Sequence, residues 1–299
     1  MPPLRIDVRR VSVPQDRNSI QLGVMAENII LVAGRDGGGT ATFQNHLVRY
    51  LITAKDSFSA EPVPANGRDS EDILDEWGAL WSEGRLPKGD GQPKDYAYRV
   101  QPLRKHKDKP TLDFAFREVS GTDLDALLAA EDGAKSAPSE ELAALLGNPD
   151  LNFVLVLLCG RDEKAGQDAG AFKQDASLAG LVACLKNNYG EEFASRCPVL
   201  LLASKACDDA VDGQGVEAFI GDNLPATLAA LQDWQGRYTL GELDIGEFEY
   251  ADDDEPLLYT PKFEDTAKIF RWIYFQLTRY TVAEPYFARL WKSVRKSVP

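Results

Sequence analysis

The chain has few of the residues that build metal sites and disulfide frameworks. It carries four cysteines and two histidines in 299 residues, and no two cysteines form a C-x-x-C pair. Three of the cysteines stand in or beside apolar runs, where cysteine behaves as a small hydrophobic residue. We therefore expect buried thiols. A catalytic triad would have to use His46, on a predicted helix, or His106, in the basic run RKHKDK, where a solvated surface position is expected.

Long apolar segments are also missing. No stretch approaches the roughly 18 consecutive apolar residues that a membrane-spanning helix needs, and the first residues, MPPLRIDVRR, lack the apolar core of a secretory signal. We therefore expect no membrane span and a cytoplasmic location.

Positive charge is scarce. Lys and Arg number 33 against 47 Asp and Glu, which gives a net charge of −14 and an isoelectric point near 4.7. A chain with this balance repels nucleic acid and anionic lipid, and no Lys/Arg-rich block with interleaved aromatics offsets it. The charge therefore predicts no nucleic-acid partner and favours protein partners.

Continuous apolar runs alternate with helical patterns along the chain. The runs NIILVA (28–33), NFVLVLLC (152–159) and PVLLLA (198–203) are typical of strands buried on both faces of a parallel sheet. The segments 97–103 and 112–119 alternate in polarity and predict an antiparallel hairpin. This order predicts an α/β fold: a mostly parallel sheet with one antiparallel strand, helices on both faces, and ligands at the carboxyl ends of the strands.

We interpret residues 1–299 as one domain with two additions. Residues 56–96 are rich in Pro, Gly, Ser and acids and predict an insertion of loops and one helix, on which Trp77 and Trp81 share a face. A place in the core is expected for these two side chains, and exposure would favour a partner contact instead. A further helix is predicted at about 283–296, where packing on the domain is also expected.

A glycine-rich loop joins the first predicted strand to a helix whose apolar residues begin at Phe43. In phosphate-binding loops of the form G-x-x-x-x-G-K-S/T, backbone N–H groups surround the phosphates, the lysine neutralises them and the hydroxyl holds magnesium. Gly34 and Gly39 occupy the glycine positions here, while Thr40 stands for the lysine and Ala41 for the hydroxyl. The candidate loop comprises Gly34, Arg35, Asp36, Gly37, Gly38, Gly39, Thr40, Ala41 and Thr42.

Over roughly residues 28–280 the chain resembles the P-loop GTPase superfamily, in its Ras-like, translation-factor-related branch, because two further motifs follow in order. The segment from Glu118 to Gly121 is similar to the family's D-x-x-G motif, with glutamate in place of the magnesium-linked aspartate. The segment around Lys205 and Asp208 is similar to its base-reading N/T-K-x-D motif, with the acid one residue late. The resemblance implies a three-layer Ras-like G domain and a nucleotide site at these residues.

The departures from the family pattern fall on the groups that grip phosphate and magnesium. The lysine, the P-loop hydroxyl and the aspartate have all changed, and residues 86–96 contain no switch threonine. Asp36 adds negative charge to the loop, and Arg35 is the cation available there to offset it. Because phosphoryl transfer needs several of these groups at once, the resemblance implies a pseudo-GTPase with no catalytic residues and no retained cofactor.

Three functional hypotheses follow. The leading one is a degenerate GTPase-like module that binds a protein partner, such as an active GTPase. The second is a working nucleotide hydrolase that binds GTP or GDP with Mg²⁺ through Thr40, Thr42, Glu118 and Arg35 or a residue of RKHKDK. The third is an unrelated doubly wound α/β protein with another small ligand at the strand ends. Calorimetry with nucleotides separates the first two.

Overall fold

A computed structural model gives the fold. The residues that it describes are 27–34, 39–54, 57–63, 70–85, 96–103, 108–119, 121, 123–124, 139–159, 167–204, 215–234, 236–250 and 256–282. The helix predicted at 283–296, loop residues 35–38, His106 and the segment around Lys205 and Asp208 lie outside them.

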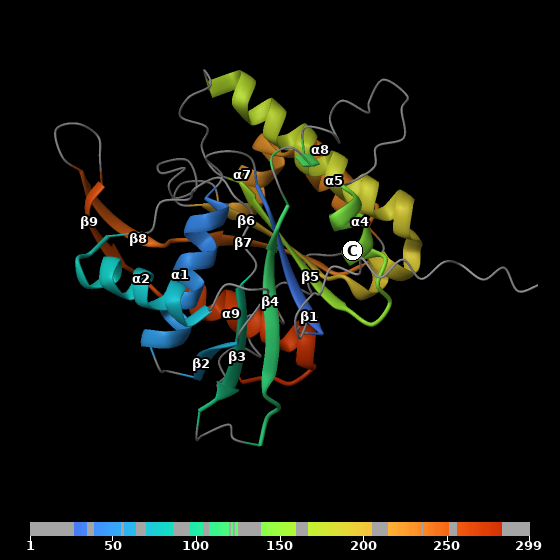
Figure 1. Ribbon diagram of the computed structural model, residues 1–299. Helices are drawn as coiled ribbons and strands as arrows, with labels where there is room; N and C mark the ends of the chain where they lie inside the picture. Colours follow the sequence, from blue (N-terminus) through green and yellow to red (C-terminus); the bar gives the residue numbers. More distant parts are fainter. Residues whose placement is uncertain are drawn as a thin grey trace, which may run out of the picture.

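The main sheet has seven strands in the order β2-β3-β4-β1-β5-β6-β7, and a separate two-stranded hairpin is formed by β8 and β9 (Figure 1). The strands are β1 (Asn28–Ala33), β2 (Phe58–Val63), β3 (Tyr96–Pro102), β4 (Leu112–Glu118), β5 (Asn152–Cys159), β6 (Val199–Ser204), β7 (Tyr238–Leu243), β8 (Gly246–Tyr250) and β9 (Pro256–Pro261). The helices are α1 (Thr40–Thr53), α2 (Ser70–Ser82), α4 (Glu140–Leu146), α5 (Gln167–Arg196), α7 (Val216–Asn223), α8 (Pro225–Gln232) and α9 (Glu264–Thr278).

The sheet is mostly parallel. β1 pairs in parallel with β4 and β5, and β5, β6 and β7 continue the parallel order. β3 is antiparallel to both of its neighbours, β2 and β4, so it alone runs against the other strands of this sheet. The expected α/β architecture, with a mostly parallel sheet, is confirmed.

Strand β2 was not expected from the sequence, which suggested loops and one helix between residues 56 and 96. Its segment, FSAEPV, alternates in polarity only over residues 58–61 and contains Pro62. Proline removes a backbone donor and is tolerated at the edge of a sheet, and β2 is an edge strand that pairs with β3. The first part of the predicted insertion therefore extends the main sheet.

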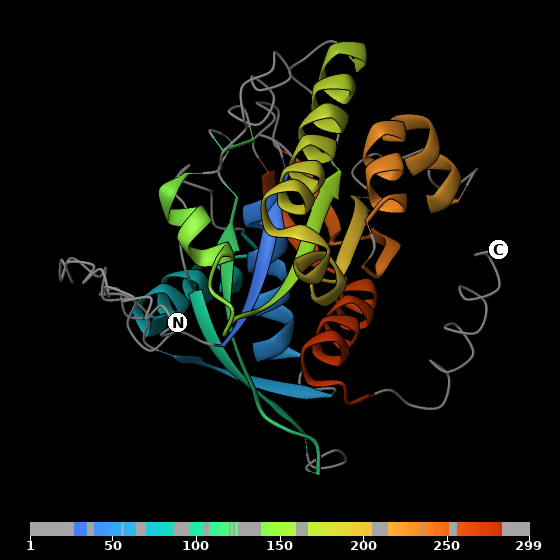
Figure 2. The ribbon, with the colours of Figure 1, turned by 90° about the vertical axis from the view of Figure 1, so that its right-hand side faces the viewer.

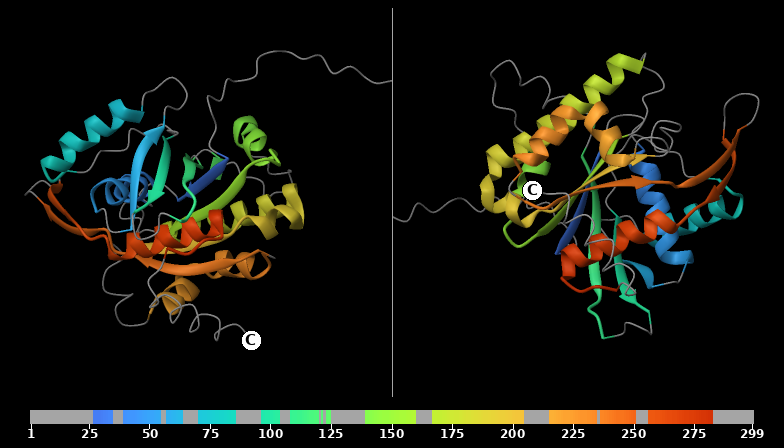
Figure 3. Two further views of the ribbon diagram at one scale, coloured as in Figure 1. Left: turned by 90° about the horizontal axis from the view of Figure 1, so that it is seen from below. Right: turned by 180° about the vertical axis from the view of Figure 1, so that it is seen from behind.

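Helices cover both faces of the sheet, as expected. Alternate residues of β1 point to opposite sides: Ile29 and Leu31 belong to one core cluster, and Ile30 and Val32 belong to the other. The first cluster is completed by side chains from α4, α5, α7 and α8, and the second by side chains from α1, α2 and α9. Figures 2 and 3 show these two helix groups on opposite faces.

The two tryptophans of α2 belong to the second core cluster or pack against it. Trp77 is 7% exposed. Trp81 is half-buried, its Nε1 donates to Asn45 Oδ1 of α1 at 3.0 Å, and the Arg49 guanidinium lies 5.8 Å from its ring centroid. The expectation that these side chains belong to the core is confirmed, and the helix within the insertion is fixed to α1.

The break in helix α5 and the burial of three cysteines agree with the expectations from the sequence. Helix α5 is interrupted at Gly190, whose φ of 77° lies in the left-handed region, and the sequence predicted a helix end there. Cys159, Cys184 and Cys197 are buried thiols, and burial raises the pKa of Cys197 to about 12. Within the described part of the chain, no helix is long and apolar enough to cross a membrane.

Candidate functional site at the carboxyl end of β1

The strand order reverses at β1. After β1 the chain crosses to the β2 edge and returns through β3 to β4, which lies beside β1; it then continues at β5, on the other side of β1. In open α/β sheets, ligands bind outside the carboxyl ends of the strands at such a switch point. The glycine loop leaves β1 at this position, so the fold places the candidate loop where ligand sites of such sheets occur.

Gly34 and Gly39 hold the two ends of the loop. A Cβ added at Gly34 would lie 3.1 Å from Thr40 Cγ2 and 3.3 Å from the Leu158 carbonyl oxygen, so this glycine lets Thr40 pack closely. Gly39 has φ 77° and ψ 22°, a left-handed conformation, and its carbonyl accepts the Phe43 N–H at 2.7 Å. Helix α1 therefore begins at Thr40 directly after a glycine turn, and no side chain caps it.

Thr40 and Glu118 meet at the end of the sheet. Glu118 is the last residue of β4 and stands opposite Val32 in the parallel register with β1. The Thr40 hydroxyl, on a residue only 9% exposed, donates a hydrogen bond to Glu118 Oε1. Thr40 stands where the family pattern has lysine, and Glu118 stands where it has aspartate. Their polar side-chain groups are thus in direct contact.

The remaining candidate residues divide into two groups. Ala41 is exposed, Thr42 is half-buried, and Gly121 is half-buried just beyond β4. Arg35, Asp36, Gly37, Gly38, Lys205 and Asp208 lie outside the described residues, although β6 ends at Ser204, directly before the base-reading candidate. The structure therefore describes the two ends of the glycine loop and the Glu118 side of the candidate site.

The described part of the site is poor in groups that hold phosphate or metal. The first turn of α1 carries no acidic residue and no lysine or arginine in its sequence TATF. Among the described residues, no group of three or more His, Cys, Asp or Glu side chains is placed to hold a metal ion. What this part of the site offers a ligand is the start of α1, the Thr40–Glu118 pair and the exposed Ala41.

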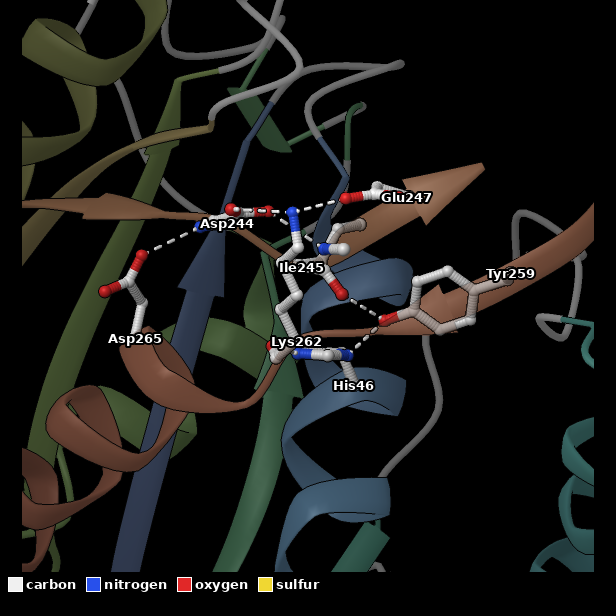
Figure 4. Close-up of polar contacts among 8 residues, drawn as sticks. His46, Asp244, Ile245, Glu247, Tyr259, Lys262 and Asp265 are labelled. Carbon is white, nitrogen blue, oxygen red and sulfur yellow. Dashed lines mark hydrogen bonds and ion pairs between the residues drawn. The ribbon is translucent and has the colours of Figure 1, made fainter. Parts of the chain in front are cut away.

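A buried polar cluster lies further along α1, and sequence reasoning missed it. His46 is fully buried; its Nε2 lies 3.0 Å from the Lys262 carbonyl oxygen, and its Nδ1 contacts the Tyr259 hydroxyl (Figure 4). Burial lowers the pKa of His46 to about 4, and the Lys262 carbonyl contact opposes that shift. Its partners follow it by more than two hundred residues, so no local pattern marks them.

The side chain of Lys262 lies on the outer side of this cluster. Its Nζ is 2.8 Å from Glu247 Oε1 and 3.8 Å from Asp244 Oδ2. The hydrogen bond with Lys262 lowers the pKa of Glu247, and the same contact raises the pKa of Lys262. Both side chains are largely exposed, so this pair adds little to the stability of the hairpin.

Comparison with known proteins does not assign the chain to a family. No family model matches the sequence, and no curated protein matches it. Among solved structures, the chain is similar to a 2,6-sialyltransferase of Photobacterium sp. JT-ISH-224, solved with CMP and lactose, at 12% identity and a TM-score of 0.16. The match covers 73% of this chain and 41% of that chain, and a likeness this weak carries no argument about fold or activity.

Proposed function

We propose that this chain is a degenerate G domain, a pseudo-GTPase-like module that binds a protein partner at the carboxyl edge of its sheet. Under this proposal the glycine loop is inherited from a P-loop ancestor and no longer holds GTP or GDP with Mg²⁺. The protein acts by contact, as an interaction or regulatory module, and an active GTPase is the partner class that the resemblance suggests.

The arrangement of elements supports a P-loop ancestry. A buried parallel strand, a glycine loop and a helix follow one another in β1, residues 34–39 and α1. The loop leaves the central strand at the switch point, and the candidate D-x-x-G segment begins at the end of the neighbouring strand β4. These are the positions that the sequence motifs require.

The hydrogen bond from Thr40 to Glu118 carries the proposal. In a working site, the residue at the first position reaches out to phosphate and the acid at the second serves the metal. Here a short hydroxyl takes the place of the long lysine, and it is directed at the acid. The pair binds within the protein and presents no cation to an incoming phosphate.

Without the phosphate lysine and the magnesium hydroxyl, the affinity for nucleotide should be much lower than in a working site. A hydrogen bond that involves a charged group contributes about 1.5–3 kcal/mol, so the loss of two such groups weakens binding by roughly 10²- to 10⁴-fold. A dissociation constant of about 1 µM would become about 0.1–10 mM. Micromolar nucleotide binding is therefore not expected.

Isothermal titration calorimetry with GTP, GDP and ATP, each with Mg²⁺, tests the nucleotide part of this proposal. We expect no saturable heat with any of the three, and no phosphate release. Saturable micromolar binding with turnover would overturn the proposal and support the alternative, a hydrolase that uses a non-standard loop. The Thr40→Lys/Ala41→Thr variant is titrated alongside, because it restores the phosphate lysine and the magnesium hydroxyl.

The same variant tests the ancestry. If the glycine loop is a phosphate frame, the restored side chains should produce measurable GTP or ATP binding. A variant that folds like wild type but binds neither GTP nor ATP would contradict a P-loop origin and would favour an unrelated α/β protein.

A pull-down with paired surface variants tests the partner part. Ala41→Arg places a large cation on an exposed position beside the candidate site, and Ala144→Arg does the same at an exposed position of α4, on the opposite face. We expect Ala41→Arg to lose a captured protein that wild type and Ala144→Arg retain. Equal capture by all three would contradict the proposed interface.

A further inference from the structure

The base of the β8–β9 hairpin is joined to α1 by a chain of polar contacts through buried side chains (Figure 4). His46, which is 0% exposed, contacts the Lys262 carbonyl through Nε2 and the Tyr259 hydroxyl through Nδ1. The Tyr259 hydroxyl, on a residue 3% exposed, also lies 2.6 Å from the Ile245 carbonyl oxygen. The chain of contacts thus runs from Lys262 through His46 and Tyr259 to Ile245.

With a neutral His46, the three contacts that link Lys262, His46, Tyr259 and Ile245 have one hydrogen too few for each to be a hydrogen bond. A backbone carbonyl only accepts, so Nε2 must carry the hydrogen that faces Lys262. Nδ1 is then an acceptor, and the Tyr259 hydroxyl must donate to it. The Tyr259 oxygen has no second hydrogen, so it cannot also donate to the Ile245 carbonyl, which lies within hydrogen-bond distance and accepts the Lys262 N–H at 3.0 Å.

A second proton on His46 removes this shortage. An imidazolium donates from both nitrogens, so Nε2 still donates to Lys262 and Nδ1 donates to the Tyr259 oxygen. The Tyr259 hydrogen is then available for the Ile245 carbonyl. All of the contacts between these residues have a hydrogen in this state, and no heavy atom needs to move.

We propose that His46 and Tyr259 form a proton-operated hydrogen-bond switch at the base of the β8–β9 hairpin. When His46 Nδ1 takes up a proton from solvent, the Tyr259 hydroxyl turns from His46 to the Ile245 carbonyl. In the neutral state Tyr259 donates to α1, and in the protonated state it donates to the turn between β7 and β8. The switch goes beyond the proposed function and does not depend on nucleotide or partner binding.

Burial and the charges around His46 together determine the pH at which the switch operates. Arg49 on α1 disfavours a second positive charge, while Asp244, between β7 and β8, favours it. Glu247 of β8 and the Lys262 side chain form an ion pair, and Asp265 of α9 pairs with Lys268. Burial outweighs these charges and lowers the pKa of His46 to about 4, so the neutral state is populated at neutral pH and the protonated state in acid.

The position of the switch gives it a structural consequence. α1 begins at Thr40 in the candidate site, and the hairpin is fixed to the end of the α2 segment by the Tyr259 N–H, which donates to the Gly84 carbonyl at 2.6 Å. Tyr259 therefore contacts α1, the α2 segment and the turn before β8. A change of its hydrogen-bond partner alters how the hairpin is held on the helix that starts at the glycine loop.

Nuclear magnetic resonance of protein labelled with ¹⁵N-histidine tests the proposal directly, because the chain has only His46 and His106. A His106→Gln sample assigns the two imidazoles. At neutral pH we expect His46 as the Nε2–H tautomer, with Nδ1 as a hydrogen-bond acceptor. The Nδ1–H tautomer at neutral pH, or a titration midpoint near that of an exposed histidine, about 6.5, would overturn the proposal.

The amide of Gly246 follows the Ile245 carbonyl and donates to Asp244 Oδ1 at 3.0 Å, so it reports the switching step by comparison between wild type and a variant without the Tyr259 hydroxyl. We expect its ¹⁵N shift to titrate with the midpoint of His46, near 4, in wild type, and to lose that titration in Tyr259→Phe. The Tyr280→Phe variant is the control, because Tyr280 is 49% exposed and should leave the titration unchanged. A Gly246 amide that ignores His46 in wild type, or follows it equally in Tyr259→Phe, would refute the switch. If Tyr259→Phe fails to fold, the wild-type tautomer and the wild-type titration midpoint of His46 decide the matter.

Discussion

The hydroxyl of Thr40 donates to the carboxylate of Glu118, and this contact ties the first turn of α1 to the last residue of β4. Under the proposed P-loop ancestry, both residues stand at positions that would meet the ligand in a working site. Their mutual hydrogen bond makes the start of α1 part of the packed end of the sheet.

Thr40→Val should destabilise the protein by about 1–3 kcal/mol, because it keeps the shape of the side chain and leaves the half-buried Glu118 carboxylate without this donor. Urea unfolding measures the change. In a double-mutant cycle with Glu118→Leu, the loss from Thr40→Val should largely disappear, since the acceptor is then also absent. Additive losses would show that the two side chains do not interact.

Asp175→Ala should lower the free energy of unfolding by about 1–3 kcal/mol. The carboxylate of Asp175, which is 7% exposed, accepts the N–H groups of Ala226 and Thr227 and the Thr227 hydroxyl at 2.7–2.9 Å, and so serves the first turn of α8. Asp233→Ala is the matched control, because that side chain is 78% exposed and its pair with Lys186 should contribute about 0–1 kcal/mol. Equal shifts in the urea midpoint would contradict this assignment.

Gly246→Ala should weaken the docking of the β8–β9 hairpin. Gly246 has φ 125°, and an added Cβ would lie 2.1 Å from the Thr260 carbonyl oxygen and 2.9 Å from the Lys262 nitrogen. Hydrogen exchange at the amides of β8 and β9 should therefore become faster. Gly78→Ala is the control: nothing lies within 4 Å of its Cβ position in α2, and it should stabilise the helix by about 0.5–1 kcal/mol.

His46 should make the protein less stable in acid. Because burial lowers its pKa from 6.5 to about 4, the unfolded chain takes up a proton more readily than the folded chain. Its contribution is fully present above pH 6.5, decreases between pH 6.5 and 4, and is lost below pH 4, a total of about 3 kcal/mol.

The difference in unfolding free energy between wild type and His46→Gln, followed from pH 7.5 to 4, isolates this contribution from the carboxylates that titrate in the same range. We expect the difference to change across that window in favour of the variant. A difference that does not depend on pH would show that His46 titrates alike in both states.

Much of the fold could be predicted because the responsible signals are local. The run NIILVA, the glycines after it and the helical spacing from Phe43 predicted β1, the loop and α1 from adjacent residues alone. Gly190 marked the interruption of α5 in the same way. Strand β2 was missed because an edge strand with Pro62 and Glu61 needs little apolar pattern, and its place depends on its pairing with β3.

The candidate site was predictable in part. Motif spacing placed Gly34, Gly39, Thr40 and Glu118 near one another, since the carboxyl ends of parallel strands share an edge. It gave no sign that Thr40 would donate to Glu118, because that contact depends on the rotamers of two residues separated by 78 positions. The cluster around His46 gave no signal either, as its partners come from the turn after β7 and from β9.

The sequence by itself determined the layered α/β arrangement, the glycine loop at the end of β1 and the absence of a lysine from that loop, because periodicity and residue identity act over a few neighbouring positions. Only the tertiary structure decided that Thr40 binds Glu118, that Trp81 packs on α1, and that His46 is buried against Tyr259. Each of these pairs joins distant segments, and only packing around the sheet brings such atoms within hydrogen-bond distance.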